Sequence, residues 1–218
     1  MDDAAVPEPS LADPRLDAFD LTARARQAYG ADGRLPPPHT ANWPIFPFEP
    51  DDVRVRHVED PVVPEPPRHG EDAADCRTCR GRDGAFVWTD DRWLVGMPDE
   101  AQSLPTVTLH TREHLDVHEL SDDLGSEMGL LLVRLQRALM SIEGVGRVHV
   151  YKWGDGGAHL HIILVARPLG MMQLRGLFLT TWMHVLPPLP ADVWAAIRAH
   201  MATALSTASG NSGLTPDP

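Results

Sequence analysis

Two groups of side chains in this sequence could do chemistry. Cys76 and Cys79 flank two residues in CRTC, and thiolates at this spacing can occupy two corners of a tetrahedral zinc site. His159 and His161 lie one residue apart in GDGGAHLHIILVARP, a stretch typical of a glycine turn followed by a β-strand. On such a strand both imidazoles would share one face, about 6–7 Å apart, and each would need a metal or a hydrogen bond to offset its burial.

CRTC leaves two corners of the tetrahedron to other side chains, and several histidines follow it in the chain. The candidates are His110, His114, His118, His149, His159 and His161. A redox-active cysteine pair is the alternative, but that motif begins a helix after a strand, whereas CRTC is expected in a polar, arginine-bearing loop. A strand histidine can also be a satisfied core residue. We favour a zinc site of two cysteines and two histidines.

The elements that must position these residues begin at Cys76. Short strands are expected at 85–88, 92–97 and 106–110, and two further strands are expected on either side of Gly-Asp-Gly-Gly, as an antiparallel hairpin over 146–168. Apolar residues at 124, 128, 131, 132, 135 and 139 predict one face of a helix, with Ser121 as its N-cap. Residues 190–205 predict a second amphipathic helix. The fold class is therefore α+β, with two principal helices.

The remaining segments are expected to lie outside this domain of residues 76–205. Residues 1–40 form a flexible arm with one short helix within 16–30, and residues 41–75 form a proline-rich wrap. VRVRHV at 53–58 alternates like an edge strand, but the dense prolines around it favour the wrap. Residues 206–218 predict a disordered tail. The apolar segment 168–190 is expected to be a flap packed on the core or buried in a dimer.

Composition excludes several classes of function. The formal net charge is −12 and no basic stripe is evident, which disfavours nucleic-acid binding. The N-terminal residues contain neither the basic segment nor the apolar run of a signal peptide, and no apolar stretch approaches the ~18 residues that span a bilayer. A cytoplasmic protein without membrane contact is therefore expected. Two cysteines three positions apart do not suggest the disulfide framework of a secreted protein.

The order of these motifs resembles the histidine triad (HIT) superfamily, including its branch of galactose-phosphate uridylyltransferases. The resemblance covers residues 76–168: CRTC, strands, LHTREHLDVHELSDD, an amphipathic helix, and VHVYKWGDGGAHLHIILVARP. It implies a HIT-like antiparallel sheet. In zinc-bearing members of the family, the positions that match Cys76, Cys79, His114 and His159 hold a structural zinc. Many members are two-fold dimers, so a homodimer is a further expectation.

The same resemblance implies that His161 is a nucleophile. In the family, the middle histidine of the strand motif attacks the α-phosphate of a nucleotide, and water or a second phosphate resolves the nucleotidyl-histidine. The chain would then be a nucleotide hydrolase or nucleotidyltransferase acting on a nucleotide or nucleotide-linked small molecule. Cations and N–H donors must surround the transferring phosphorus. The residues expected to bind the substrate are Lys152, Gly156, Gly157, Gln173 and Arg175.

Two departures from the family pattern support an alternative function. The third motif position, usually His or Gln, is Ile163, which can neither donate a hydrogen bond nor share a proton. The polar run before the motif is replaced by WGDGG, whose Asp155 would repel a phosphate if it faced the site. The alternative is a catalytically impaired HIT-like protein that binds a nucleotide or a partner protein. A third interpretation keeps His161 as a core histidine or a spare ligand.

Overall fold

The computed structural model describes residues 17–49, 51, 53–81 and 86–209, and the chain divides into two compact units. One unit contains Met1–Ala41 and Phe48–Pro66, and the other contains Asn42–Pro47 and Pro67–Pro218. The domain boundaries expected at residues 40, 75 and 205 stay predictions. Within the described residues, no helix is both long and apolar enough to span a membrane.

The smaller unit contains the short helix expected within 16–30. This helix, α1 (Ala18–Gln27), begins after Asp17, whose side chain accepts hydrogen bonds from the N–H groups of Phe19 and Asp20. Residues 53–58 pair with no strand in the described chain, so the edge strand is not formed there, and the proline-rich wrap stays a prediction. Just beyond this segment, Asp60 forms an ion pair with Arg26 at 2.7 Å. The expected features of residues 1–16 lie outside the described residues.

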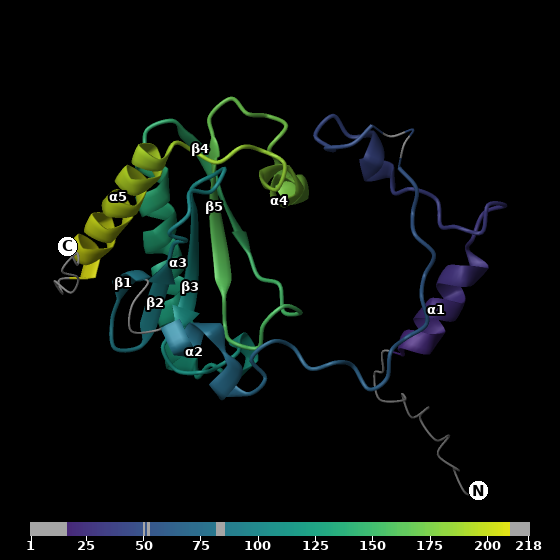
Figure 1. Ribbon diagram of the computed structural model, residues 1–218, viewed down its shortest axis with the longest axis horizontal. Coiled ribbons are helices and arrows are strands. Elements are labelled where there is room, and N and C mark those ends of the chain that lie inside the picture. The colour runs from purple at the N-terminus through teal and green to yellow at the C-terminus, as the bar shows by residue number, and fades with distance from the viewer. Residues whose placement is uncertain (1–16, 50, 52, 82–85, 210–218) are drawn as a thin grey trace, which may run out of the picture. The chain divides into compact units, whose positions relative to one another are not determined.

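The larger unit is built on one five-stranded antiparallel sheet (Figure 1). The spatial order of the strands is β1-β2-β3-β5-β4. Their bounds are close to those expected from the alternation of apolar residues: β1 (Phe86–Thr89), β2 (Trp93–Gly96), β3 (Thr106–Thr111), β4 (Val145–Tyr151) and β5 (Ile162–Pro168). The α+β fold class is therefore confirmed.

Two long helices cover one face of the sheet (Figure 1). Helix α3 (Asp122–Met140) begins at Ser121, whose hydroxyl accepts a hydrogen bond from the Leu124 N–H at 3.3 Å, as the sequence predicts. Helix α5 (Ala191–Ser209) runs four residues beyond its expected end, so residues 206–209 are helical, and only 210–218 of the expected tail lie outside the described residues. The shared core contains Val95, Leu109, Leu135, Leu139, Leu164, Trp194 and Met201.

The segment after β5 covers the opposite face. It contains helices η5 (Gly176–Phe178) and α4 (Leu179–Met183), and Figure 1 shows α4 on the side of the sheet away from α3 and α5. Leu174 and Leu179 are buried there with Val165. Met172 and Leu177 are exposed, so the apolar segment packs on the sheet through only part of its residues.

The hairpin differs from the expected one in its connection. Tyr151 pairs with Ile163, and residues 152–161 form the connection in place of a tight glycine turn. His159 and His161 therefore precede β5 and are not strand residues. The cause is long-range pairing: the Leu160 N–H donates to the carbonyl of Leu115 at 2.7 Å and not to a neighbouring strand.

Candidate metal and nucleophile site

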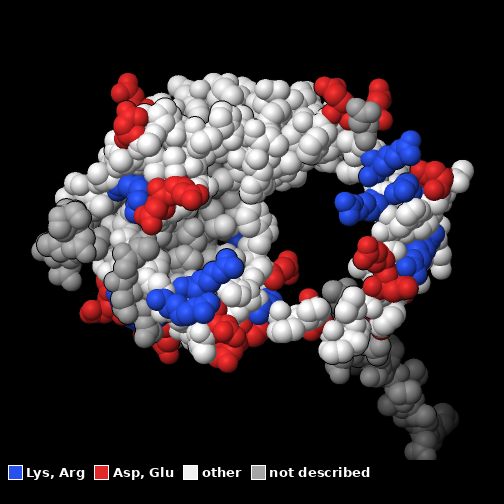
Figure 2. Space-filling model, viewed as in Figure 1, with Lys and Arg blue, Asp and Glu red and all other residues white. Residues whose placement is uncertain are grey.

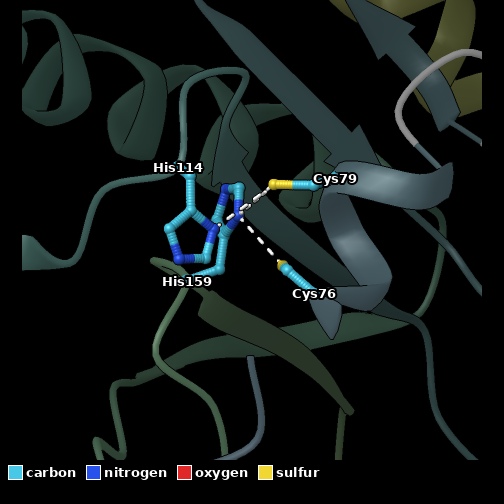
Figure 3. A group of neighbouring side chains, drawn as sticks. All are labelled: Cys76, Cys79, His114 and His159. Atoms are coloured by element: carbon cyan, nitrogen blue, oxygen red, sulfur yellow. Dashed lines mark hydrogen bonds between the residues drawn. The ribbon is translucent and has the colours of Figure 1, made fainter. Parts of the chain in front are cut away.

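Four potential metal ligands converge in the larger unit. One ligand atom from each of Cys76, Cys79, His114 and His159 lies within 4.8 Å of the other three (Figure 3). The Cys76 sulfur lies 3.4 Å from His159 Nδ1, and the Cys79 sulfur lies 3.3 Å from His114 Nδ1 and 3.5 Å from His159 Nδ1. The structure thus brings together the four residues that the resemblance implies.

These separations fit the edges of a zinc tetrahedron. With Zn–S bonds of about 2.3 Å and Zn–N bonds of about 2.0–2.1 Å, a tetrahedral site has S···N edges of about 3.6 Å. The three measured sulfur–nitrogen distances of 3.3–3.5 Å are close to that value. Two thiolates and two imidazoles are also the donor set that zinc prefers. The residues present therefore fit a structural zinc ion.

The hydrogen bonding of His159 leaves the lone pair on Nδ1, the ring nitrogen that could bind a metal. Its Nε2 lies 2.8 Å from the carbonyl oxygen of Thr111 in β3, and because a carbonyl only accepts, Nε2 must carry the hydrogen. The lone pair of the neutral ring is then on Nδ1, the atom that faces the two sulfurs. His159 is buried, and burial lowers its pKa, which favours the neutral ring that a metal ligand requires.

Cys76 immediately precedes a short helix, α2 (Arg77–Gly81), and Cys79 lies within it, so the pair is not in the expected loop. The Arg80 N–H donates to the Cys76 carbonyl at 3.1 Å, which closes the first turn. This turn follows the 3-10 helix η3 (Ala73–Asp75) and not a strand. The assumed loop therefore gives no argument against a redox pair; the case for a metal is the two imidazoles beside the sulfurs.

Gly70 packs against the same turn. Its φ is +75°, and a Cβ built on it would lie 3.2 Å from both Cα and Cβ of Cys76. The carbonyl of the preceding residue, His69, accepts a hydrogen bond from the Ala158 N–H at 3.0 Å. Residues 69 and 70 thus join the cysteine turn to the connection that carries His159.

The ring of His161 has a different hydrogen-bond partner from that of His159. Its Nδ1 lies 2.8 Å from the carbonyl oxygen of His159, so Nδ1 carries the hydrogen and donates it. The neutral ring then has its lone pair on Nε2. A Cβ built on Gly157 would lie 3.9 Å from His161 Cε1, so the glycine connection borders this ring. His161 is half-buried and lies outside the group of four potential ligands.

The predicted substrate-binding residues are only partly gathered around His161. Gly157 borders its ring, and Gly156 is exposed. The Lys152 ammonium group lies 3.5 Å from Asp116 Oδ1. Gln173 and Arg175 are exposed in the segment after β5, and no hydrogen bond or ion pair in the described chain joins either of them to His161.

Sequence reasoning missed an ion-pair network beside the site. Arg68 Nη1 donates to Asp116 Oδ2 at 2.6 Å and to the Gly154 carbonyl at 2.9 Å, and its Nε donates to Glu71 at 2.8 Å. Burial raises the pKa of Asp116, but the bonds from Arg68 and the Val117 N–H, with the charges of Lys152 and Arg68, lower it to about 2. Arg68 therefore links the connection of residues 152–161 to the segment after His114.

The network had one sequence signal. Asp116 and Glu119 form a capping box around the 3-10 helix η4 (Val117–Glu119), and their spacing in DVHE is that of a cap. Arg68 stands among prolines and has no local signature. Its role depends on contacts 48 and 86 residues away in the chain.

Comparisons with known proteins give only distant similarity. No family model matches the chain, and no curated protein matches it. Among solved structures, a histidine triad protein from Marinobacter aquaeolei VT8 is similar at 19% identity with a TM-score of 0.46, over 58% of this chain and 92% of that one. A histidine triad protein from Bradyrhizobium japonicum is similar at 14% identity with a TM-score of 0.48, over 59% of this chain and 96% of that one. A Zn-bound histidine triad family protein from Mycobacterium smegmatis is similar at 13% identity with a TM-score of 0.44, over 62% of this chain and 99% of that one. Similarity at this level leaves the chemistry to be judged from the side chains themselves.

Proposed function

We propose that the chain is a zinc-bearing, HIT-like nucleotide hydrolase or nucleotidyltransferase with His161 as its nucleophile. The observation that supports this most directly is the hydrogen bond from His161 Nδ1 to the His159 carbonyl, because it leaves Nε2 with the lone pair. The residue whose carbonyl accepts this bond is the proposed metal ligand His159. The metal site and the nucleophile are therefore rigidly linked through two residues of backbone.

The proposed reaction has two displacements. Nε2 of His161 attacks the α-phosphorus, the bond from phosphorus to the leaving-group oxygen breaks, and the electron pair departs with that oxygen. The His159 carbonyl stabilises the positive charge on the substituted imidazole through the Nδ1–H. Water or an acceptor phosphate then attacks phosphorus, and the phosphorus–nitrogen bond breaks with its electron pair returning to Nε2, which regenerates the neutral ring. When water is the acceptor, its extra proton is released to solvent.

Zinc has a structural part in this proposal. Bound by Cys76, Cys79, His114 and His159, it would join helix α2 and the segment after β3 to the connection before β5. In this way it would fix the backbone that orients His161. No chemical step passes through the metal.

The residue at the third motif position points to a leaving-group class. Ile163 packs with Leu174 and Leu179 in an apolar cluster and offers no proton donor. A leaving group that departs as a stable anion needs no proton, whereas an amine does. We therefore favour phosphoanhydride substrates, such as nucleotide sugars and dinucleoside polyphosphates, over nucleotide phosphoramidates.

The second candidate is a HIT-like protein that binds a nucleotide or a partner protein without turnover. Ile163 supports it, and so does the position of Lys152 beside the Asp116 carboxylate, which partly neutralises a cation expected to bind phosphate. A homodimer and a cytoplasmic location stay predictions.

Turnover of a substrate panel by wild type, His161→Ala and His118→Ala tests the proposal. His118 is an exposed histidine in η4, so its variant controls for the loss of an imidazole. We expect His161→Ala to lower kcat/KM by at least about 1,000-fold with unchanged zinc content, and His118→Ala to match wild type. Nucleotide binding without turnover in wild type would favour the second candidate, and neither binding nor turnover would contradict both.

A further inference from the structure

Arg167 in β5 is a buried cation with an unused hydrogen-bonding edge. Arg167 is only 7% exposed, and its Nη1 donates to the carbonyls of Pro168 at 3.0 Å and Met171 at 3.2 Å. Its Nε is buried without a partner, and no hydrogen bond in the described chain uses Nη2. The Nε–Nη2 edge is the fork with which arginine binds a carboxylate or phosphate through two parallel bonds.

No acidic side chain among the described residues compensates this charge. Arg167 has no ion pair within the described residues, and Asp155 is the only acidic residue from 145 to 190 in a chain with 31 of them. Arg147 lies directly opposite Arg167 on β4, and like charges at this position destabilise a sheet. In the view of Figure 2, a broad area over the segment after β5 shows no acidic side chains. Burial of an uncompensated cation is strongly unfavourable, so a counter-charge is expected here.

His149 adds a second unpaired nitrogen at the same place. It lies two residues along β4 from Arg147, on the same face of the sheet, and pairs with Val165. Its Nε2 is buried and has no hydrogen-bond partner among the described residues, and the ring is stacked on Tyr151 at 6.2 Å with an interplanar angle of 11°. Burial lowers the pKa of His149, and the positive charge of Arg167 lowers it further. A water molecule could satisfy these hydrogen bonds, but it could not neutralise the guanidinium.

We propose that Arg167, His149 and Arg147 bind an oxyanion, the phosphate or carboxylate group of a small molecule, at one end of the β4–β5 hairpin. Arg167 Nε and Nη2 form the fork, His149 Nε2 donates a third bond, and Arg147 contributes charge from the edge strand. Arg167 follows His161 by six residues, about 20 Å of extended chain, so this site is separate from the proposed nucleophile. The proposal does not depend on the reaction proposed for His161.

Binding of inorganic phosphate and of citrate to the full chain tests this site, with sodium chloride at equal ionic strength as the reference. Calorimetry and thermal melts would be recorded for wild type, Arg167→Lys, Arg147→Gln and His149→Phe. Arg167→Lys keeps the charge but removes the fork, and His149→Phe keeps a ring for Tyr151 to stack on. The matched control is Arg137→Gln, because Arg137 is an exposed arginine of α3 without an ion pair in the described chain.

We expect at least one of the two oxyanions to raise the melting temperature of wild type more than chloride does. Its Kd should rise at least about tenfold in Arg167→Lys and about threefold to tenfold in His149→Phe, with a smaller rise in Arg147→Gln and none in Arg137→Gln. The oxyanion that binds more tightly identifies the phosphate or the carboxylate class. No response of wild type to either oxyanion would overturn the proposal. Undiminished binding in His149→Phe would overturn it as well, even if Arg167→Lys does not fold.

Discussion

Substitution of Gly70 by alanine should damage the metal site without replacing a ligand. The φ of +75° would cost an alanine about 1–2 kcal/mol, because this left-handed conformation brings Cβ close to the following carbonyl. The new Cβ would also lie 3.2 Å from Cα and Cβ of Cys76, and overpacking of this kind costs about 1–3 kcal/mol. The expected loss in the free energy of unfolding is therefore about 2–5 kcal/mol.

Gly144→Ala is the matched control. Gly144 has a φ of +82°, but a Cβ built there meets nothing within 4 Å, so only the conformational loss of about 1–2 kcal/mol applies. Urea unfolding in excess zinc would measure both free energies, and competition with a chromogenic chelator would measure zinc affinity. Gly70→Ala should bind zinc at least about tenfold more weakly, and Gly144→Ala should bind it as wild type does. Equal losses of stability with equal zinc affinities would refute the argument that Gly70 positions the Cys76 turn.

Three further predictions concern the ligands, the third motif position and pH. Cys76→Ser should weaken zinc binding by at least about 100-fold and destabilise the fold, measured by metal analysis and thermal melts; a stable variant with one zinc per chain would contradict this. Ile163→His should raise turnover of a nucleotide phosphoramidate by supplying a proton donor, and an unchanged rate would show that the missing donor is not limiting. Burial, with the charge of Arg167, lowers the pKa of His149, so the unfolded chain binds this proton more readily and stability falls as pH drops below about 6.5. In buffer without oxyanions, wild type should therefore lose more stability than His149→Phe between about pH 7.5 and 5, and equal losses would be inconsistent with that shift.

The sequence predicts those elements whose stabilising residues lie close together in the chain. The apolar spacing of α3 and its Ser121 cap lie within one segment, and the structure has that helix where it is expected. The histidine pair shows the limit of this reasoning. Residues 158–161 alternate like a strand, but the Leu160 N–H bonds to Leu115, which is 45 positions earlier, and β5 starts only at Ile162.

The residues of the candidate site also differ in whether the sequence could predict them. The CxxC spacing suggests a metal from sequence alone and supplies Cys76 and Cys79, and the resemblance supplies His114 and His159 as the other two ligands. Arg68 could not be found, because Asp116 and Gly154, the partners that join it to the site, are far along the chain and its own segment is rich in proline. The unpaired nitrogens of Arg167 and His149 also have no sequence signal, since only strand pairing brings them together.

The central claim is that His159 holds metal while His161 does chemistry, and trapping the covalent intermediate tests it most directly. Wild type and His161→Ala would be mixed with a dinucleoside polyphosphate or a nucleotide sugar, quenched at alkaline pH, and examined by intact-mass and peptide mass spectrometry, with zinc measured in parallel. The account predicts one nucleoside monophosphate group on His161 in wild type, and none in a His161→Ala protein that keeps its zinc and its fold. Turnover that persists in His161→Ala, or loss of zinc and fold in that variant, would contradict it.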